Sequence, residues 1–308
     1  MTKITKIFFS LLITLAVFIW VAVVRSPSSI GCNIYFFNVG QGDSALIEKG
    51  NFQLLVDGGP DDKILSEIGK VMPLTDRKIE VVILTHPHAD HLVGINQIID
   101  RYEVGKIYST GVIHTSNAYL EFLDKVKNKN ISLEVPDVGQ KINPFDNSEL
   151  KFLWPGKNYI EKSAEDNNLN NTSLVSRFCY FDHCVLLPGD LEADGQEAMF
   201  SYYSSKQSEV PAAKSENESS ETLASNNNIF QSEILKVAHH GSTNGTNQKL
   251  LDIVKPKYAI ISAGVDNKFG HPHSGTLDLL QKANIRYYRT DRDGTIEFNF
   301  SEQGIAKK

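Results

Sequence analysis

The feature that most constrains this chain is a histidine-rich string, THPHADH at positions 85–91, directly after an apolar run at 81–84. The apolar run is typical of a buried strand, so His86 stands at its end and the proline-containing turn returns His88 beside it. Asp90 and His91 then begin a predicted helix, displaced enough to serve a second ion. Imidazole and carboxylate groups are ligands that zinc and similar divalent metals accept. The string therefore predicts a metal site at the mouth of a strand.

Short strand-like segments punctuated by glycines run through most of the chain, with helical patterns between them. The predicted strands are 34–39, 44–48, 52–57, 81–85, 106–109, 173–178, 185–187, 234–238, 258–262 and 295–298. The predicted helices are 64–71, 92–102 and 118–129. Because strands occur in both halves, we expect an α/β fold of the α+β type, in which helices cover a sandwich of two sheets.

The N-terminal region carries a long apolar segment. Residues 7–24 contain no charged side chain and follow Lys3 and Lys6. A helix of this length spans roughly 27 Å, close to the thickness of a bilayer core. We therefore expect residues 1–31 to be a membrane anchor and link, with a cleaved signal peptide as the alternative. The two lysines favour a cytoplasmic N-terminus, which predicts a single-pass cell-membrane protein with an extracytoplasmic catalytic domain, secreted if the segment is cleaved.

Residues 32–308 are predicted to form one catalytic domain. The stretch 204–228 is rich in Ser, Glu, Asn and Ala and nearly free of large apolar residues, so we expect a disordered insertion there. The formal net charge of −6 excludes nucleic-acid binding through bulk charge. A polyanionic substrate needs metal or a local patch, for which Lys255, Lys257, Arg286, Arg289 and Arg292 are candidates, unless they are merely solvated.

Three cysteines are too few for a disulfide scaffold or a cysteine-rich zinc module. Cys179 and Cys184 flank a predicted hairpin turn. They could form a cross-hairpin disulfide, or they could remain two independent thiols.

Further motifs accompany the histidine string in a fixed order. They lie at 38–44, 55–59, 170–175, 188–192, 236–242, 270–273 and 290–294. Together they resemble the metallo-β-lactamase superfamily, and within it the branch that forms the C-terminal domain of ComEC-type competence DNA-uptake proteins. The resemblance spans residues 33–300 and implies a four-layer αββα sandwich. The multi-span channel region of full ComEC proteins is missing, which indicates a stand-alone member.

The resemblance implies a centre with two divalent ions, zinc or else manganese. The ligands it implies are His86, His88, Asp90, His91, Asp190, His239 and His240. His86 and His88 would bind the first ion and Asp90 and His91 the second, with Asp190 bridging both. His239 or His240 would complete the second site. Since neighbouring residues on a strand point to opposite sides, we expect only one of these two to ligate.

The candidate catalytic residues are Asp90, Asp57, His271 and His273. Asp57 would accept a hydrogen bond from a ligand and fix its orientation, unless it only forms a turn. His271 and His273 would protonate a leaving group or hydrogen-bond a phosphate oxygen, unless they lie in a plain loop. Many superfamily members have another histidine where this chain has 170–173, and its absence would leave the first site weaker or open to substrate.

Paired divalent ions can make water a reactive nucleophile, so no nucleophilic side chain is needed. The resemblance narrows the expected activity to a phosphodiesterase or nuclease-like hydrolase acting on DNA at the outer membrane-facing surface. Such an enzyme would be linked to DNA uptake, with a separate channel protein as a candidate partner. The alternatives are a hydrolase of a small or cell-envelope ester (phosphorylcholine, a lactone or a lactam) and a non-catalytic binding module. The full ligand set argues against the last.

Overall fold

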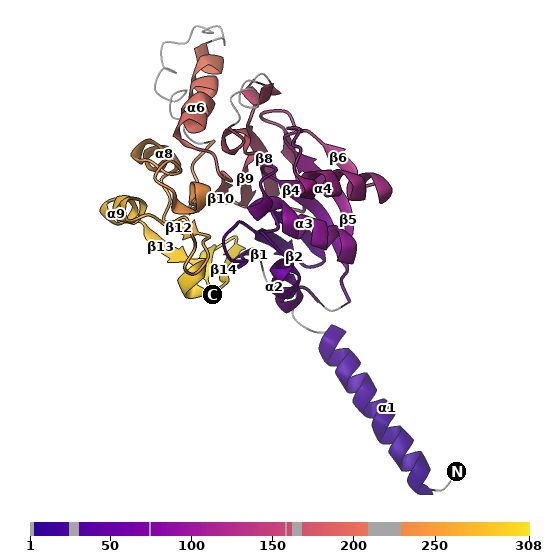
Figure 1. Cartoon of the computed structure of the whole chain (residues 1–308). Coiled ribbons are helices and arrows are strands. Elements are labelled where there is room, and N and C mark those ends of the chain that lie inside the picture. The colour runs from indigo at the N-terminus through magenta and orange to yellow at the C-terminus, as the bar shows by residue number, and fades with distance from the viewer. Residues whose placement is uncertain (1–2, 25–30, 74, 158, 162–167, 209–228) are drawn as a thin grey trace, which may run out of the picture. The chain divides into compact units, whose positions relative to one another are not determined.

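The computed structural model describes residues 3–24, 31–73, 75–157, 159–161, 168–208 and 229–308 (Figure 1). The chain divides into two compact units, Met1–Ile30 and Gly31–Lys308, and the first contains helix α1 (Lys3–Val24). A membrane span requires length and sustained apolarity together, and no helix within the described residues combines them. The predicted transmembrane helix, and the cell-membrane localisation that rested on it, are therefore wrong.

The first sheet of the second unit has eight strands in the order β15-β14-β1-β2-β3-β4-β5-β6. Strands β15 to β3 pair antiparallel, and β3 to β6 pair parallel. The strands are β1 (Cys32–Phe36), β2 (Ala45–Lys49), β3 (Phe52–Val56), β4 (Lys78–Leu84), β5 (Glu103–Ser109), β6 (Ser132–Glu134), β14 (Ile296–Ser301) and β15 (Gly304–Lys307).

The second sheet has seven strands in the order β13-β12-β11-β10-β9-β8-β7. Strands β10 to β13 are parallel, and β7 to β10 are antiparallel. The strands are β7 (Lys141–Ile142), β8 (Ser148–Trp154), β9 (Val175–Tyr180), β10 (His183–Leu187), β11 (Ile234–Lys236), β12 (Tyr258–Ile261) and β13 (Arg286–Arg289).

Three apolar clusters hold the layers together. One joins the facing sides of the two sheets, with Phe36 and Phe178 among its fully buried side chains. A second packs α2 (Lys63–Val71), α3 (Ala89–Arg101) and α4 (Asn117–Asn128) on the first sheet. The third packs α6 (Ala193–Ser208), α8 (Gln248–Val254) and α9 (Ser274–Lys282) on the second. The expected two-sheet sandwich with helices outside is confirmed (Figure 1).

Several elements differ from the expectation. Strands β6, β7, β8, β13 and β15 and helices α6, α8 and α9 were not predicted. The short helices are η1 (Asn170–Thr172), η2 (Ala238–Gly241) and α10 (Thr290–Asp293). Helix α6 runs to Ser208, so the first five residues of the 204–228 stretch are helical. Residues 209–228 lie outside the described residues.

One close backbone contact fixes the end of β3 against helix α3. A Cβ added to Gly94 would lie 1.9 Å from the carbonyl oxygen of Gly58, so this contact accepts no side chain. The amide of Gly58 also donates a hydrogen bond of 2.7 Å to the carbonyl of His91. Since Asp57 directly precedes Gly58, the contact sets the position of Asp57 relative to the helix that carries His91.

We expect Gly94→Ala to lower the free energy of unfolding by about 2 kcal/mol, because the new methyl group overlaps the Gly58 backbone. Gly69→Ala is the matched control, since Gly69 lies in α2 with nothing within 4 Å of an added Cβ. That change should stabilise the protein by about 0.5–1 kcal/mol. Urea unfolding compares the two variants. Equal effects would show that the β3–α3 contact is looser than described.

Candidate metal centre

The candidate site residues come from chain segments at the carboxyl ends of neighbouring strands. Asp57 follows β3, the histidine string follows β4, Asp190 follows β10, and η2 with His240 follows β11. Asp43 lies just before β2. Because the two sheets face each other, these strand ends bring residues from distant parts of the chain to one place.

Four of these residues form a compact donor cluster. Asp90, His91, Asp190 and His240 each offer one ligand atom, and the atoms all lie within 4.8 Å of one another. Oδ2 of Asp190 lies 3.3 Å from Nε2 of His91 and 3.4 Å from Nε2 of His240. Oδ2 of Asp90 lies 3.3 Å from the same His240 nitrogen. Asp190 is thus the carboxylate around which the cluster is arranged.

The cluster fits a divalent cation. Within the described residues, Nε2 of His91, Nε2 of His240 and Oδ1 of Asp190 are buried without a hydrogen-bond partner. Unpaired buried polar atoms are costly and rare in folded proteins. Two imidazoles and two carboxylates form a donor set that zinc and manganese accept, and one ion among them would give both nitrogens a partner.

Strong fields act between the members of the cluster. Burial alone would lower the pKa values of His91 and His240, but the carboxylates around them, Asp190 first, raise both well above the usual range. Burial alone would raise the pKa of Asp190, but His240 and His91 hold it well below its usual value. The carboxylates and imidazoles of the cluster thus favour each other's charged forms, and a metal ion would compete with protons for the same imidazole nitrogens.

His86 and His88 lie together next to the donor cluster, and the His86 ring centroid is 4.2 Å from that of His91. Nε2 of His86 is 2.9 Å from Nδ1 of His88 and 3.9 Å from Oδ2 of Asp190. Ser173 lies in the segment where a further histidine was noted as missing. Its Oγ accepts a hydrogen bond of 3.1 Å from the amide of Asp190 and lies 3.4 Å from Nδ1 of His86. Ser173 thus contacts two candidate ligands, and His86 and His88 are left as the candidate imidazoles of the first site.

Asp57 contacts the back of His91. Its Oδ2 lies 2.8 Å from Nδ1 of His91, and the amide and hydroxyl of Thr85 donate hydrogen bonds of 2.8 and 2.7 Å to its two oxygens. This arrangement holds the His91 ring with Nε2 toward Asp190. Asp57 also has a positive φ of 58°. It therefore forms a turn and contacts His91 as well, so the two roles considered for it are compatible.

Asp43 contacts His240 on the ring nitrogen that faces away from the cluster, and Lys236 pairs with Asp43; neither residue was a predicted site residue. Oδ1 of Asp43 lies 3.1 Å from Nδ1 of His240, and Oδ2 lies 2.7 Å from Nζ of Lys236. Burial alone would raise the pKa of Asp43, but Lys236 and His240 lower it to about 2. Asp43 belongs to the motif at 38–44, and that membership was the one sequence signal that could have found it.

The structure separates His239 from His240. Both have positive φ, 49° and 53°, inside η2, so they do not alternate as residues on a strand would. His240 lies in the donor cluster. His239 places Nδ1 3.2 Å from Oε1 of Glu192 and Nε2 3.8 Å from Oδ2 of Asp190. The strand geometry on which the expectation of one ligand rested is wrong, because the two histidines lie in a left-handed turn; that only one of them ligates stays a prediction.

His271 and His273 differ in their distance from the donor cluster. The His271 ring centroid lies 5.7 Å from that of His239 and 6.2 Å from that of His240, so His271 borders the donor cluster. Burial, with the charge of His240 next in effect, lowers the pKa of His271 to about 4. Nε2 of His273 lies 3.1 Å from the carbonyl oxygen of Phe269, and its ring stands behind His271, at 4.9 Å between centroids.

His239 and His240 are a matched pair for testing the ligand assignment. We expect His240→Ala to lose bound metal after dialysis, because it removes one of four converging donors, while His239→Ala retains it. Metal content per chain is measured by inductively coupled plasma mass spectrometry. The assignment is wrong if the two variants lose metal to the same extent.

Asp43→Asn should weaken zinc affinity by about 10–100-fold, the usual effect of removing a partner of a ligating histidine. Asp146→Asn, at an exposed site distant in sequence from the metal centre, is the control and should bind zinc as the wild type does. Competition with a chromophoric chelator measures both. Unchanged affinity in Asp43→Asn would mean that the His240 ring is held by other contacts.

Comparison with known proteins agrees with this geometry. The sequence model of the metallo-beta-lactamase superfamily matches residues 37–265. The chain is 25% identical over 227 residues to ComE operon protein 3 of Bacillus subtilis, covering 74% of this chain and 25% of that protein. It is 25% identical over 272 residues to competence protein ComA of Neisseria gonorrhoeae, covering 87% and 32%. The chain thus spans about a quarter to a third of these relatives.

A solved structure shows the same fold at low sequence identity. CmlA, a diiron β-hydroxylase from Streptomyces venezuelae, superimposes with a TM-score of 0.51 and 13% identity, covering 89% of this chain and 55% of that one. The residues matched by the superfamily include the whole donor cluster together with Asp43, Asp57 and Lys236. By sequence and by fold, the chain belongs to the metallo-β-lactamase superfamily, with relatives among ComEC-type competence proteins.

Proposed function

We propose that this chain is a metal-dependent hydrolase of phosphodiesters, with DNA or a related nucleic acid as its substrate class. The observation that carries the proposal is the position of Asp190, whose Oδ2 lies 3.3 Å from Nε2 of His91, 3.4 Å from Nε2 of His240 and 3.9 Å from Nε2 of His86. A carboxylate in that position can serve two ions. The names of the relatives refer to competence and recombination, and this supports nucleic acid as the substrate class.

The proposed first site comprises His86, His88 and Asp190, and the proposed second site comprises Asp90, His91, Asp190 and His240. Divalent ions held there would supply Lewis acidity and a water nucleophile that is reactive near neutral pH. The chain's own contribution is to fix the donor atoms before substrate arrives. Asp57 does this through His91 and Asp43 through His240.

His271 is the candidate contact to the substrate. Its ring borders those of His239 and His240, and its Nδ1 is buried without a hydrogen-bond partner within the described residues. With a pKa lowered to about 4, the imidazole is neutral at pH 7. It therefore suits a hydrogen bond to a phosphate oxygen better than proton donation to a leaving group. His273, turned toward Phe269, would support the His271 ring.

The test is a substrate panel with the full chain in Mn²⁺ or Zn²⁺: labelled single-stranded DNA, bis(p-nitrophenyl) phosphate and nitrocefin. We expect cleavage of both diesters and no turnover of the lactam. Asp90→Ala should reduce diester hydrolysis by more than about 100-fold, because it removes a metal ligand. Asp194→Ala, an exposed aspartate in the first turn of α6, is the control and should retain full activity.

Three outcomes would contradict the proposal. Turnover of nitrocefin alone would move the enzyme to the ester and lactam class. Hydrolysis that persists in Asp90→Ala would show that the activity arises elsewhere. Cleavage of the small diester without cleavage of DNA would remove nucleic acid as the substrate.

A further inference from the structure

A row of positive charges crosses the outer face of the second sheet. Lys141 of β7 is directly opposite Lys151 of β8, and Lys151 is directly opposite Arg177 of β9. The neighbouring residues Ile142 and Phe178 pack into the core between the sheets, so the three cations share the outer face. Like charges directly opposite each other destabilise a sheet. Such a row needs an explanation beyond folding.

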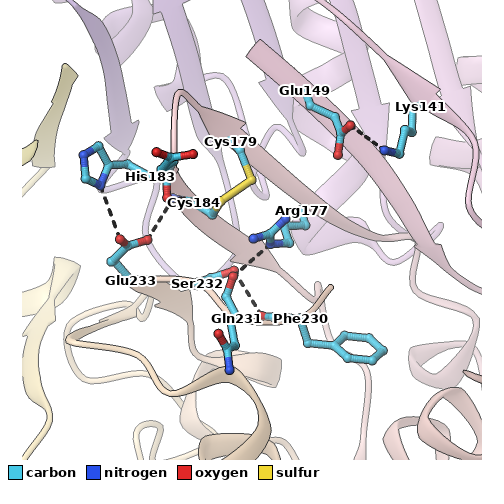
Figure 2. The surroundings of a disulfide bond; sticks show 11 residues. Lys141, Glu149, Arg177, Cys179, His183, Cys184, Phe230, Gln231, Ser232 and Glu233 are labelled. Carbon is cyan, nitrogen blue, oxygen red and sulfur yellow. Dashed lines mark hydrogen bonds and ion pairs between the residues drawn. A yellow bond between two sulfur atoms is a disulfide. The ribbon is translucent and has the colours of Figure 1, made fainter. Parts of the chain in front are cut away.

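The described residues neutralise little of this row. Lys141 pairs with Glu149 at 2.6 Å, but within the described residues Lys151 and Arg177 form no ion pair. Arg177 donates from Nε to the carbonyl of Gln231 at 2.9 Å (Figure 2). Burial, with the charge of Lys141 next in effect, lowers the pKa of Lys151. The positive charges of the row are close enough for one to disfavour the protonated form of its neighbour.

The row lies in a groove that continues along the sheet. Arg177 and Asp182 line both the hollow that holds the row and a second hollow. Lys257 lines this second hollow and a third, which also contains Arg286. Lys255 and Lys257 are exposed and, in the part of the chain that is described, unpaired. Shared lining residues make the three hollows one basic groove.

The basic groove lies away from the metal centre. Lys257 and Arg286 stand at the amino ends of β12 and β13, whereas Asp190 and His240 follow the carboxyl ends of β10 and β11. These cations therefore do not form a rim of the metal centre. They are a separate surface on a chain whose formal net charge is −6.

The disulfide between Cys179 and Cys184 lies beside the row (Figure 2). The two residues are directly opposite each other on β9 and β10, so the bond ties the hairpin whose tip, Phe181 and Asp182, lines the groove. The open choice between a disulfide and two thiols is thereby decided for the disulfide.

The carboxylates in the basic groove are largely committed to the chain itself. Glu233 accepts a hydrogen bond from the amide of Cys184 at 3.0 Å and lies 3.3 Å from Nδ1 of His183 (Figure 2). Glu149 pairs with Lys141. Among the described residues that line the groove, Asp182 is the remaining carboxylate, and it is outnumbered by Lys151, Arg177, Lys255, Lys257 and Arg286.

We propose that the basic groove binds the sugar-phosphate backbone of a single-stranded nucleic acid, away from the metal centre. The cations would track the backbone, and the half-buried rings of Phe181 and Tyr287 would offer faces for bases. A concave channel suits a flexible polymer better than a flat lipid surface. The choice of polymer rests on the proposed function, whereas the presence of an anion site rests on the groove alone.

The test measures binding of a fluorescein-labelled oligothymidylate to the metal-free full chain by anisotropy over a salt series. Lys255→Glu/Lys257→Glu should raise Kd by about tenfold or more. It should also reduce the slope of log K against log salt by roughly 1.4, since each lost phosphate contact on a single strand removes about 0.7. Lys151→Gln, which keeps the length of the side chain nearly unchanged, should weaken binding less. Lys127→Glu, on α4, is the control and should bind as the wild type.

Equal affinities of the double variant and Lys127→Glu would overturn the proposal. So would competition by inorganic phosphate as effective as that by unlabelled oligonucleotide, or preferential binding to phosphatidylglycerol vesicles. Hydrolysis of bis(p-nitrophenyl) phosphate by the metal-loaded wild type is a separate readout. Its failure with oligonucleotide binding intact would remove the proposed function and leave the groove assignment standing.

Discussion

The structure depends on holding carboxylate and imidazole side chains together in a site that is almost fully shielded from solvent. Asp190 and His240 are almost fully buried beside His91, and Asp90 completes the set. Burying charges is costly unless they are paired or bind a metal. Opposite charges inside the cluster offset part of that cost, and a divalent cation would offset the rest. The surrounding fold can be understood as the support that this cluster needs.

That support comes from both sheets. Asp57, at the end of β3, contacts the nitrogen of His91 that faces away from the cluster, and Asp43, before β2, does the same for His240. Lys236, on β11 of the other sheet, holds Asp43 ionised. The Asp43–Lys236 pair therefore also connects the two sheets next to the candidate metal centre. The orientation of His240 therefore depends on how the two sheets pack against each other.

Local sequence pattern was sufficient to predict the two-sheet sandwich and to place the histidine string at the end of a strand. Both predictions depend on short-range periodicity. The Asp43–Lys236 contact was beyond reach, because it joins distant segments through sheet packing. The choice of His240 depended on a left-handed turn that its sequence does not signal. The apolar N-terminal run suggested a membrane span that the described helices do not provide. Two of the cations grouped by sequence as a possible substrate patch, Lys257 and Arg286, lie at the amino ends of their strands, whereas Arg289 ends β13.

The central claim is a metal centre built from nitrogen and oxygen donors around Asp190. X-ray absorption at the zinc edge of the zinc-loaded protein tests it most directly. The account predicts a coordination shell of nitrogen and oxygen at about 2.0–2.2 Å with no sulfur, because Cys179 and Cys184 are joined to each other and Cys32 is buried on β1. A shell containing sulfur near 2.3 Å, or zinc that washes away without leaving a bound fraction, would contradict it.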